Sequence, residues 1–213
     1  MIKKLGRKKL VVIICIIIIS LIFIIFFTKN NYKNFKTGNN MSNKNIEEIE
    51  GYILNISSYE ATIQVTIESN KNTNKYVLFQ QYISPNKSKL IMLEPSNIAG
   101  LEITNDGNNL TITNTKLNLN NVYDNYEYVV GNQMSLETFI SEYKTCKEQN
   151  KAKLYEENDE YILEANVEQN KYIYNKRLYI SKKTGNPTKL LIQDVNEKTL
   201  VYILYNEIKI NDL

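Results

Sequence analysis

The sequence predicts a mostly β (α+β) protein: a curved antiparallel sheet that forms an incomplete β-barrel with covering helices, preceded by one transmembrane helix. Residues 10–27 are continuously apolar. From residue 59 onward, short segments with alternating apolar and polar residues follow one another at turn-length spacing. Two further segments, one before each run of predicted strands, have helical apolar spacing. So many antiparallel strands must curl or close, and the helices would cover one face.

The apolar segment reads LVVIICIIIISLIFIIFF and carries no charge. As a helix its 18 residues would span about 27 Å, enough for the hydrocarbon core of a bilayer. Lipid offers no partner to the backbone, so the segment must be helical there. Residues 1–9 contain five basic residues and no acid. We therefore expect a cytoplasmic N-terminus and a single-pass protein of the cell membrane with its bulk outside.

Cys15 raises the alternative of a cleaved and lipidated signal. A lipidated cysteine follows a small residue at the end of the apolar region, but two isoleucines precede Cys15 and apolar residues continue to Phe27. The nearest small-residue cleavage site, Thr37-Gly38, lies well downstream. We expect an uncleaved anchor and no lipid on Cys15, and a processed signal stays the alternative.

Four parts of the chain follow from these patterns. Residues 1–9 are the cytoplasmic basic tail and residues 10–27 the transmembrane anchor. Residues 28–44 are polar, rich in Asn and Lys and without period, which is typical of a flexible stalk. Residues 45–213 then form one extracytoplasmic domain, long enough to bury a sizeable core.

The first predicted helix begins near Ser42 or Asn43. Ser42 or Asn43 is the expected N-cap, and Glu47 and Glu48 lie in the first turns, where the helix dipole favours acids. Its apolar stripe is formed by Ile46, Ile49, Ile53 and Ile56.

The second predicted helix is capped by Ser135 and ends near Lys147 or Glu148. Its apolar face would touch either a packed core or a bound chain, so the same residues are the candidate lid or groove of the domain. They are Leu136, Phe139, Ile140 and Tyr143.

The strands are predicted from period-two alternation. In YEATIQVTIES, Ile63, Val65 and Ile67 should face the core. The Asp-Gly pair in NDGNN predicts a hairpin, and KKTGNP and VNEK are turns between later strands. Further strands are expected at 75–84, 87–94, 99–105, 109–114 and 116–120, and then at 152–157, 160–167, 171–181, 188–195 and 199–210.

Composition excludes several classes of function. The chain has no His, which excludes His-dependent triads and HExxH zinc sites. Cys146 is the only cysteine outside the anchor, so no intrachain disulfide forms there. Beyond the tail, 21 basic residues face 23 acidic ones, a net charge of −2 that argues against nucleic acid as a partner.

The residues that could take part in catalysis or bind a metal have simpler structural interpretations. EENDE at 156–160 gathers four carboxylates, as an acid–base pair or a cation site would need, but a solvated turn between strands is the preferred interpretation. Ser135 is a helix cap, and neither it nor Cys146 has a His to activate it. We expect no catalytic, cofactor-binding or metal-binding residues, no cofactor and no enzymatic activity.

Five segments together carry a resemblance to a known family. The opening helix runs into ISSYEATIQVTIES, and YISPNKSKLIMLEP, ITNDGNNLTITN, SLETFISEY and RLYISKKTGNPTKLLIQD follow in order. In this order the chain resembles the LolA/LolB-like superfamily of lipoprotein carriers, which implies an incomplete barrel with helices as a lid. Within it the chain is most similar to the clostridial spore germination lipoprotein GerS and its relatives. It departs from them in lacking a convincing lipidation motif.

The resemblance implies a function. GerS-like proteins support the cell-wall amidase that makes muramic-δ-lactam in the spore cortex, and hence support germination. The expectation is therefore a non-catalytic, membrane-anchored extracytoplasmic binding protein whose partner is a cell-wall amidase or another extracytoplasmic protein. A location between the spore membranes fits the resemblance. The alternative is a LolA-like binder or carrier of lipid or lipoprotein acyl chains, with some of the 16 Tyr and six Phe lining a groove.

Overall fold

The computed structural model describes residues 45–126 and 133–211, all within the second of the chain's two units, Asn39–Leu213. The predicted tail, anchor and stalk, residues 1–44, lie outside the described residues, so these boundaries stay predictions. Within the described ranges, every helix is too short or too polar to span a bilayer.

The described residues form one antiparallel sheet of eleven strands in the order β6-β5-β4-β3-β2-β1-β11-β10-β9-β8-β7. Two meanders, β1–β6 and β7–β11, are joined where β1 pairs with β11. β6 and β7 are the two ends of the sheet, which is therefore not closed. The strands are β1 Ser58–Glu68, β2 Thr73–Ile83, β3 Lys87–Glu94, β4 Glu102–Asn105, β5 Leu110–Asn114, β6 Leu119–Tyr123, β7 Ala152–Glu157, β8 Glu160–Ala165, β9 Asn175–Ser181, β10 Pro187–Gln193 and β11 Thr199–Ile210.

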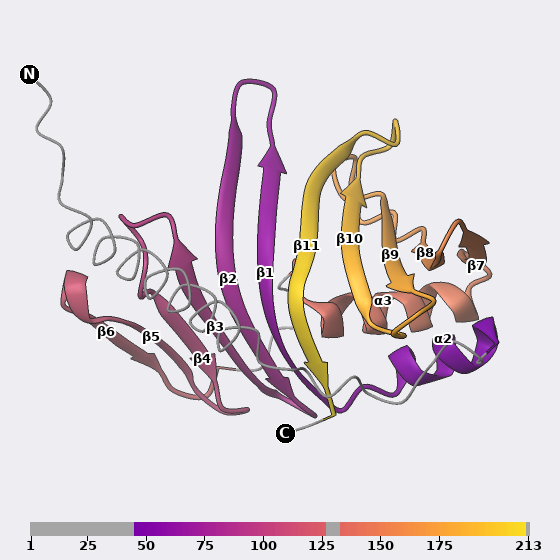
Figure 1. The fold of residues 1–213 in the computed structure, drawn as a ribbon. Helices are drawn as coiled ribbons and strands as arrows, with labels where there is room; N and C mark the ends of the chain where they lie inside the picture. The colour runs from indigo at the N-terminus through magenta and orange to yellow at the C-terminus, as the bar shows by residue number, and fades with distance from the viewer. Residues whose placement is uncertain (1–44, 127–132, 212–213) are drawn as a thin grey trace, which may run out of the picture. The chain divides into compact units, whose positions relative to one another are not determined.

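The sheet is curved, and α3 crosses the half formed by β7–β11 (Figure 1). Register shifts occur in four strand pairs, for example between Thr62 and Ile63 of β1 opposite β11. An extra residue on one strand bends it and increases its twist, which helps a long sheet to curl. The predicted mostly β class with a curved, unclosed antiparallel sheet is confirmed.

The first helix, α2, spans Ile46–Leu54. Its N-cap is Asn45, whose side-chain oxygen accepts a hydrogen bond from the backbone N–H of Glu48 at 2.8 Å. The predicted caps, Ser42 and Asn43, are therefore wrong by two or three residues, because Asn45 has the extended backbone of a cap and reaches a free N–H of the first turn.

The second helix, α3, spans Leu136–Glu148, as predicted. Ser135 is its cap: the hydroxyl oxygen accepts from the backbone N–H of Thr138 at 3.3 Å. The predicted apolar face, Leu136, Phe139, Ile140 and Tyr143, is buried. These residues pack with Ile49 and Ile53 of α2 and with the inner face of the sheet, which we define as the face that carries Ile63.

Alternation decides which side chains reach the inner face. Ile63 and Val65 of β1 are fully buried as predicted, and Ile67 is partly buried against the same core. Across the sheet, Ile63 lies opposite Leu78 of β2 and Tyr205 of β11.

Two turns agree with the sequence. The Asp106 carboxylate accepts hydrogen bonds from the backbone N–H groups of Asn109 and Asn108, which hold its pKa below the ordinary value and close the hairpin between β4 and β5. Gly185, at a positive φ of 71°, forms the turn between β9 and β10 within TGNP.

Two of the strand boundaries that differ from the sequence prediction have a clear local cause. A strand at 116–120 is wrong, because Thr115–Leu117 forms a single 3-10 turn capped by the Asn114 side chain, and β6 begins only at Leu119. β9 begins at Asn175 rather than at 171, because the Asn170 side chain accepts from the N–H groups of two following residues and holds a turn there.

Candidate binding cavity

The inner face of the sheet has two halves that differ in how far the helices bury them. The packed half is the inner face of β1 and β8–β11, which lies against α3 and α2. The open half is the inner face of β2–β5. In the packed half, Leu163, Leu178 and Ile203 are fully buried. In the open half, Leu90, Ile103 and Leu110 are only half-buried, although their residue types are equally apolar.

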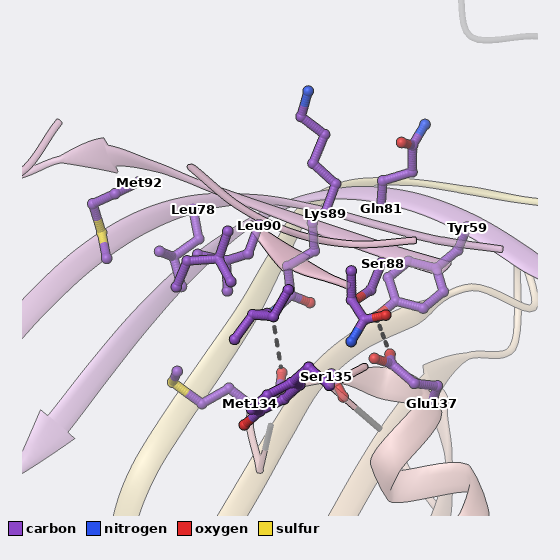
Figure 2. A pocket seen from close by; sticks show the side chains of 15 residues that line it. Tyr59, Leu78, Gln81, Ser88, Lys89, Leu90, Met92, Met134, Ser135 and Glu137 are labelled. Atoms are coloured by element: carbon purple, nitrogen blue, oxygen red, sulfur yellow. Dashed lines mark hydrogen bonds between the residues drawn. The ribbon is translucent and has the colours of Figure 1, made fainter. Parts of the chain in front are cut away.

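A cavity of about 470 Å³ lies against the open half. Its apolar wall comes from alternating positions of consecutive strands, which point to one side of the sheet. Figure 2 shows Leu78, Leu90 and Met92 extending from the sheet toward the segment that holds Met134 and Ser135. The apolar side chains that line it are Leu78, Leu90, Met92, Ile103, Leu110 and Met134.

Gln80 of β2 is a buried polar residue that lines the cavity. Its side-chain amide N–H donates to the backbone oxygen of Met134 at 3.4 Å. Its side-chain oxygen is buried and has no hydrogen-bond partner among the described residues. Across the strands Gln80 lies opposite Leu90, and Leu90 lies opposite Ile103. The Gln80 oxygen, a hydrogen-bond acceptor, therefore lies at one end of a row of apolar side chains formed by Leu90 and Ile103.

Tyr59 and Glu137 bound the same end of the cavity. The Tyr59 hydroxyl donates to Glu137 Oε2 at 2.5 Å (Figure 2). The same hydroxyl accepts from the backbone N–H of Leu136 at 3.3 Å. Burial, and then the negative charge of Glu137, raise the pKa of Tyr59 well above its ordinary value. The hydroxyl therefore stays protonated and fixes the first turn of α3 under the sheet.

The charged lining residues point in different directions. Lys89 extends away from the cavity to the opposite side of the sheet (Figure 2), where its amine lies 2.8 Å from Glu102 Oε1. Glu137 lies beneath the sheet on the cavity side (Figure 2). Among the described lining residues, the charge inside is therefore a carboxylate, and the lysine is outside.

Lys176 of β9 holds the segment before α3 from the other side. Its side chain is 0% exposed, and its amine donates to Glu142 at 2.5 Å and to Gln133 at 2.6 Å. Burial lowers its pKa from the ordinary value. A buried ion pair needs such geometry, because an unpaired buried charge is very costly. The hydrogen bond from Lys176 to Gln133 thus helps to position the neighbouring Met134, which lines the cavity.

The four residues predicted as a lid or groove do not line this cavity. Leu136, Phe139, Ile140 and Tyr143 face the packed half, and α3 contributes Ser135 and Glu137 from its N-terminal end instead. Their role as a lid stays a prediction. The sequence identified Ser135 as a cap. It did not single out Gln80 or the apolar row beside it, because nothing local distinguishes them from other inward strand positions.

The carboxylates of EENDE lie at the hairpin between β7 and β8. Glu156 pairs with Lys182 at 2.7 Å, and Glu160 pairs with Lys189 at 2.9 Å. No group of three potential metal ligands occurs within the described ranges. Cys146 is buried, and burial raises the pKa of its thiol, which makes the reactive thiolate rarer.

No protein-family model and no curated protein matches the chain. An uncharacterized conserved protein from Thermus thermophilus has a similar structure, with a TM-score of 0.50, 13% identity, and coverage of 78% of this chain and 88% of that one. A chain in the structure of the CwlD amidase from Clostridioides difficile in complex with the GerS lipoprotein is also similar, with a TM-score of 0.48, 23% identity, and coverage of 76% and 91%.

A LolA superfamily protein from Nitrosomonas europaea matches with a TM-score of 0.36 and 10% identity, over 80% of this chain and 95% of that one. The solved structures found by similarity thus include a chain from a complex that contains GerS and a LolA superfamily protein, the two groups that the sequence is predicted to resemble. At these identities the likeness extends no further than the fold.

Proposed function

We propose that the protein is a non-catalytic, membrane-anchored extracytoplasmic binding protein that supports a cell-wall amidase of the spore cortex by direct protein contact. The resemblance of the sequence to GerS suggests the partner. The observation that carries the contact itself is the edge strand β6, which ends the sheet.

The β6 edge is suited to pair with a strand of another protein. Within the described ranges no strand pairs with the outer side of β6. The strand, LNNVY, contains no charge, and its Val122 and Tyr123 are 55% and 47% exposed. An uncharged edge with exposed apolar side chains offers both backbone hydrogen bonds and side-chain contacts to an added strand.

The opposite edge, β7, is different. Its sequence, AKLYEE, carries Lys153, Glu156 and Glu157, and charges along an edge discourage pairing with another chain. The two edge strands thus differ in how well each could pair with a strand of another protein. A protein contact through the sheet edge is expected at β6 and not at β7.

The test is direct binding between the full-length protein in lipid nanodiscs and the purified cell-wall amidase of the same organism, measured by biolayer interferometry. Val122→Lys should weaken binding at least about tenfold, because it places a desolvated charge at the contact. Glu157→Lys at the β7 edge adds the same side chain at the other end and should leave the affinity unchanged.

Equal binding by the parent and Val122→Lys would remove the β6 edge from the proposal. Equal weakening by both variants would indicate a general effect of charge. Absence of binding by the parent protein would count against the amidase as partner.

The anchor has its own test: intact mass of the membrane-extracted protein should include the N-terminal segment, and a chain beginning at a diacylated Cys15 would contradict it.

A second candidate function is binding of an acyl chain in the cavity. The half-buried apolar wall of the open half favours it, because a bound chain would remove that surface from water. A photoreactive acyl probe should then label peptides of β2–β4 in the full-length protein, and an excess of unlabelled ligand should prevent the labelling. Labelling that no unlabelled ligand reduces would contradict a specific site.

A further inference from the structure

The cavity contains a buried hydrogen-bond acceptor that the described part of the protein leaves unused. Gln80 is 3% exposed, and its side-chain oxygen has no partner there, whereas its amide N–H is engaged by Met134. Buried polar groups nearly always have partners in folded proteins. The missing partner must be a hydrogen-bond donor, and the cavity that Gln80 lines is the place from which one can arrive.

The charges around the cavity restrict which donor can enter. Lys89 points to the other side of the sheet, and Glu137 lies on the cavity side (Figure 2). The Tyr59 hydroxyl already donates to Glu137. An ionised fatty acid has no hydrogen to donate to the Gln80 oxygen, and its negative charge would lie on the same side of the sheet as the Glu137 carboxylate, which is unfavourable. A neutral hydroxyl or amide meets no such penalty.

The apolar surface begins directly beside this acceptor. Gln80, Leu90 and Ile103 follow one another across β2, β3 and β4, so two strand spacings, roughly 10 Å, separate the acceptor from the far end of the row. Leu90 and Ile103 are half-buried and would be covered by a ligand that extends from Gln80. The site thus combines one polar point with an adjoining apolar strip.

We propose that the cavity binds a neutral amphiphile whose hydroxyl or amide N–H donates to Gln80 and whose apolar chain lies against Leu90 and Ile103, and that it rejects anionic amphiphiles. This inference rests on the second candidate function, binding in the cavity, and adds the chemistry of the head group. It makes Gln80 the residue that determines specificity.

The test compares two photoreactive ten-carbon probes that carry a terminal diazirine: a monoacylglycerol, which is neutral and has hydroxyl donors, and the corresponding fatty acid anion. Each is cross-linked to the full-length protein in nanodiscs, and labelled peptides of β2–β4 are quantified by mass spectrometry. The monoacylglycerol should label these peptides at least about tenfold more strongly. Unlabelled monodecanoylglycerol should compete for the site, and methyl decanoate, which has acceptors only, should compete at least about tenfold less well.

Gln80→Leu provides the decisive variant, and Gln81→Leu is its matched control. The control makes the same change at the next residue, whose side chain points to the opposite side of the sheet (Figure 2). Gln80→Leu should abolish the advantage of monodecanoylglycerol over methyl decanoate as a competitor, because both ligands are neutral and differ in the donor that Gln80 would accept, whereas Gln81→Leu should retain that advantage. Thermal unfolding checks that both variants fold. Gln80→Leu removes an unpaired buried oxygen but also the hydrogen bond to Met134, so its melting temperature should stay close to that of the parent.

Each outcome bears on one of the two claims. Equal labelling by both probes, equal competition by methyl decanoate, or an unchanged advantage of monodecanoylglycerol over methyl decanoate in Gln80→Leu would overturn the inference while cavity binding stands. No specific labelling by either probe would overturn both the inference and the acyl-binding function.

Discussion

The packed half and the open half of the inner face are made from the same kinds of residue but reach different degrees of burial. Leu178 and Ile203 in the packed half are fully buried, whereas Leu90 and Ile103 in the open half are half-buried. All four occupy inward positions of antiparallel strands. The difference is the helix: α3 lies against one half and reaches the other only with its first turn.

This difference separates two uses of apolar surface. In the packed half, apolar burial stabilises the fold, at roughly 25 cal/mol per Å² removed from water. In the open half, part of that surface remains exposed after folding, so its burial is still available to a ligand. Substitutions in the two halves should therefore have different consequences: loss of stability in one and loss of binding in the other.

The largest expected effect is a charge in the packed half. Ile63→Asp places an unpaired carboxylate at a fully buried position, which costs several kcal/mol or more and should prevent accumulation of folded protein. Thr62→Asp is the control, because Thr62 is next in the strand and lies on the other face, half-buried. Expression and cooperative urea unfolding of the full-length variants measure this. Cooperative unfolding of Ile63→Asp at the parent's midpoint would show that this face is not the core.

The second-largest effect is expected from truncation of an aromatic side chain of α3 that packs on the packed half. Phe139 is fully buried, with its ring centroid 5.9 Å from that of Tyr143. Phe139→Ala should lower the free energy of unfolding by roughly 3–5 kcal/mol and leave labelling of the cavity unchanged. A small loss of stability together with a loss of labelling would instead show that Phe139 forms part of a ligand groove, as the lid prediction allows.

A hydrogen bond between α3 and α2, the two helices that cover the packed half, should have an effect on stability that depends on pH. The Tyr143 hydroxyl donates to Glu50 at 2.9 Å, and burial, followed by that contact, raises the pKa of Tyr143 above its ordinary value of 10.0. The folded state therefore keeps this proton where the unfolded state releases it. The stabilisation is present below pH 10 and declines as the pH rises above it.

Tyr143→Phe tests this dependence. At pH 7 the substitution should cost about 1 kcal/mol, the worth of one hydrogen bond. Between pH 9 and about pH 11, the stability of Tyr143→Phe should fall less steeply with pH than that of the parent. Urea unfolding at several pH values measures both quantities. Parallel pH profiles for the parent and Tyr143→Phe would contradict the raised pKa.

The smallest effect on stability is expected in the open half. Ile103 is half-buried, so Ile103→Ala should lower the free energy of unfolding by only about 1 kcal/mol. It should instead weaken labelling by the neutral probe, because the chain of the ligand loses its contact. If Ile103→Ala destabilises the protein as strongly as Phe139→Ala, the two halves do not differ as the structure indicates.

The sequence by itself determined the local structure and the side to which residues point. Period-two alternation placed Ile63 and Val65 in the core, Ser135 identified the start of α3, and Asp-Gly located a hairpin. These features depend on backbone preferences and hydrogen bonds within a few residues, so they are visible in a short window.

Only the tertiary structure decided how these elements divide the inner face. Pairing of β1 with β11 joins the two meanders across more than 130 residues of chain, and no local pattern specifies it. Lys176 occupies an inward position that alternation would assign to an apolar residue, and it is accommodated because Glu142 arrives from α3. The unpartnered oxygen of Gln80 likewise depends on which elements surround this residue, and no local pattern specifies them. Alternation determines the face of the sheet on which a side chain lies. Its burial and its hydrogen-bond or ion-pair partners depend on contacts with residues that are distant in sequence.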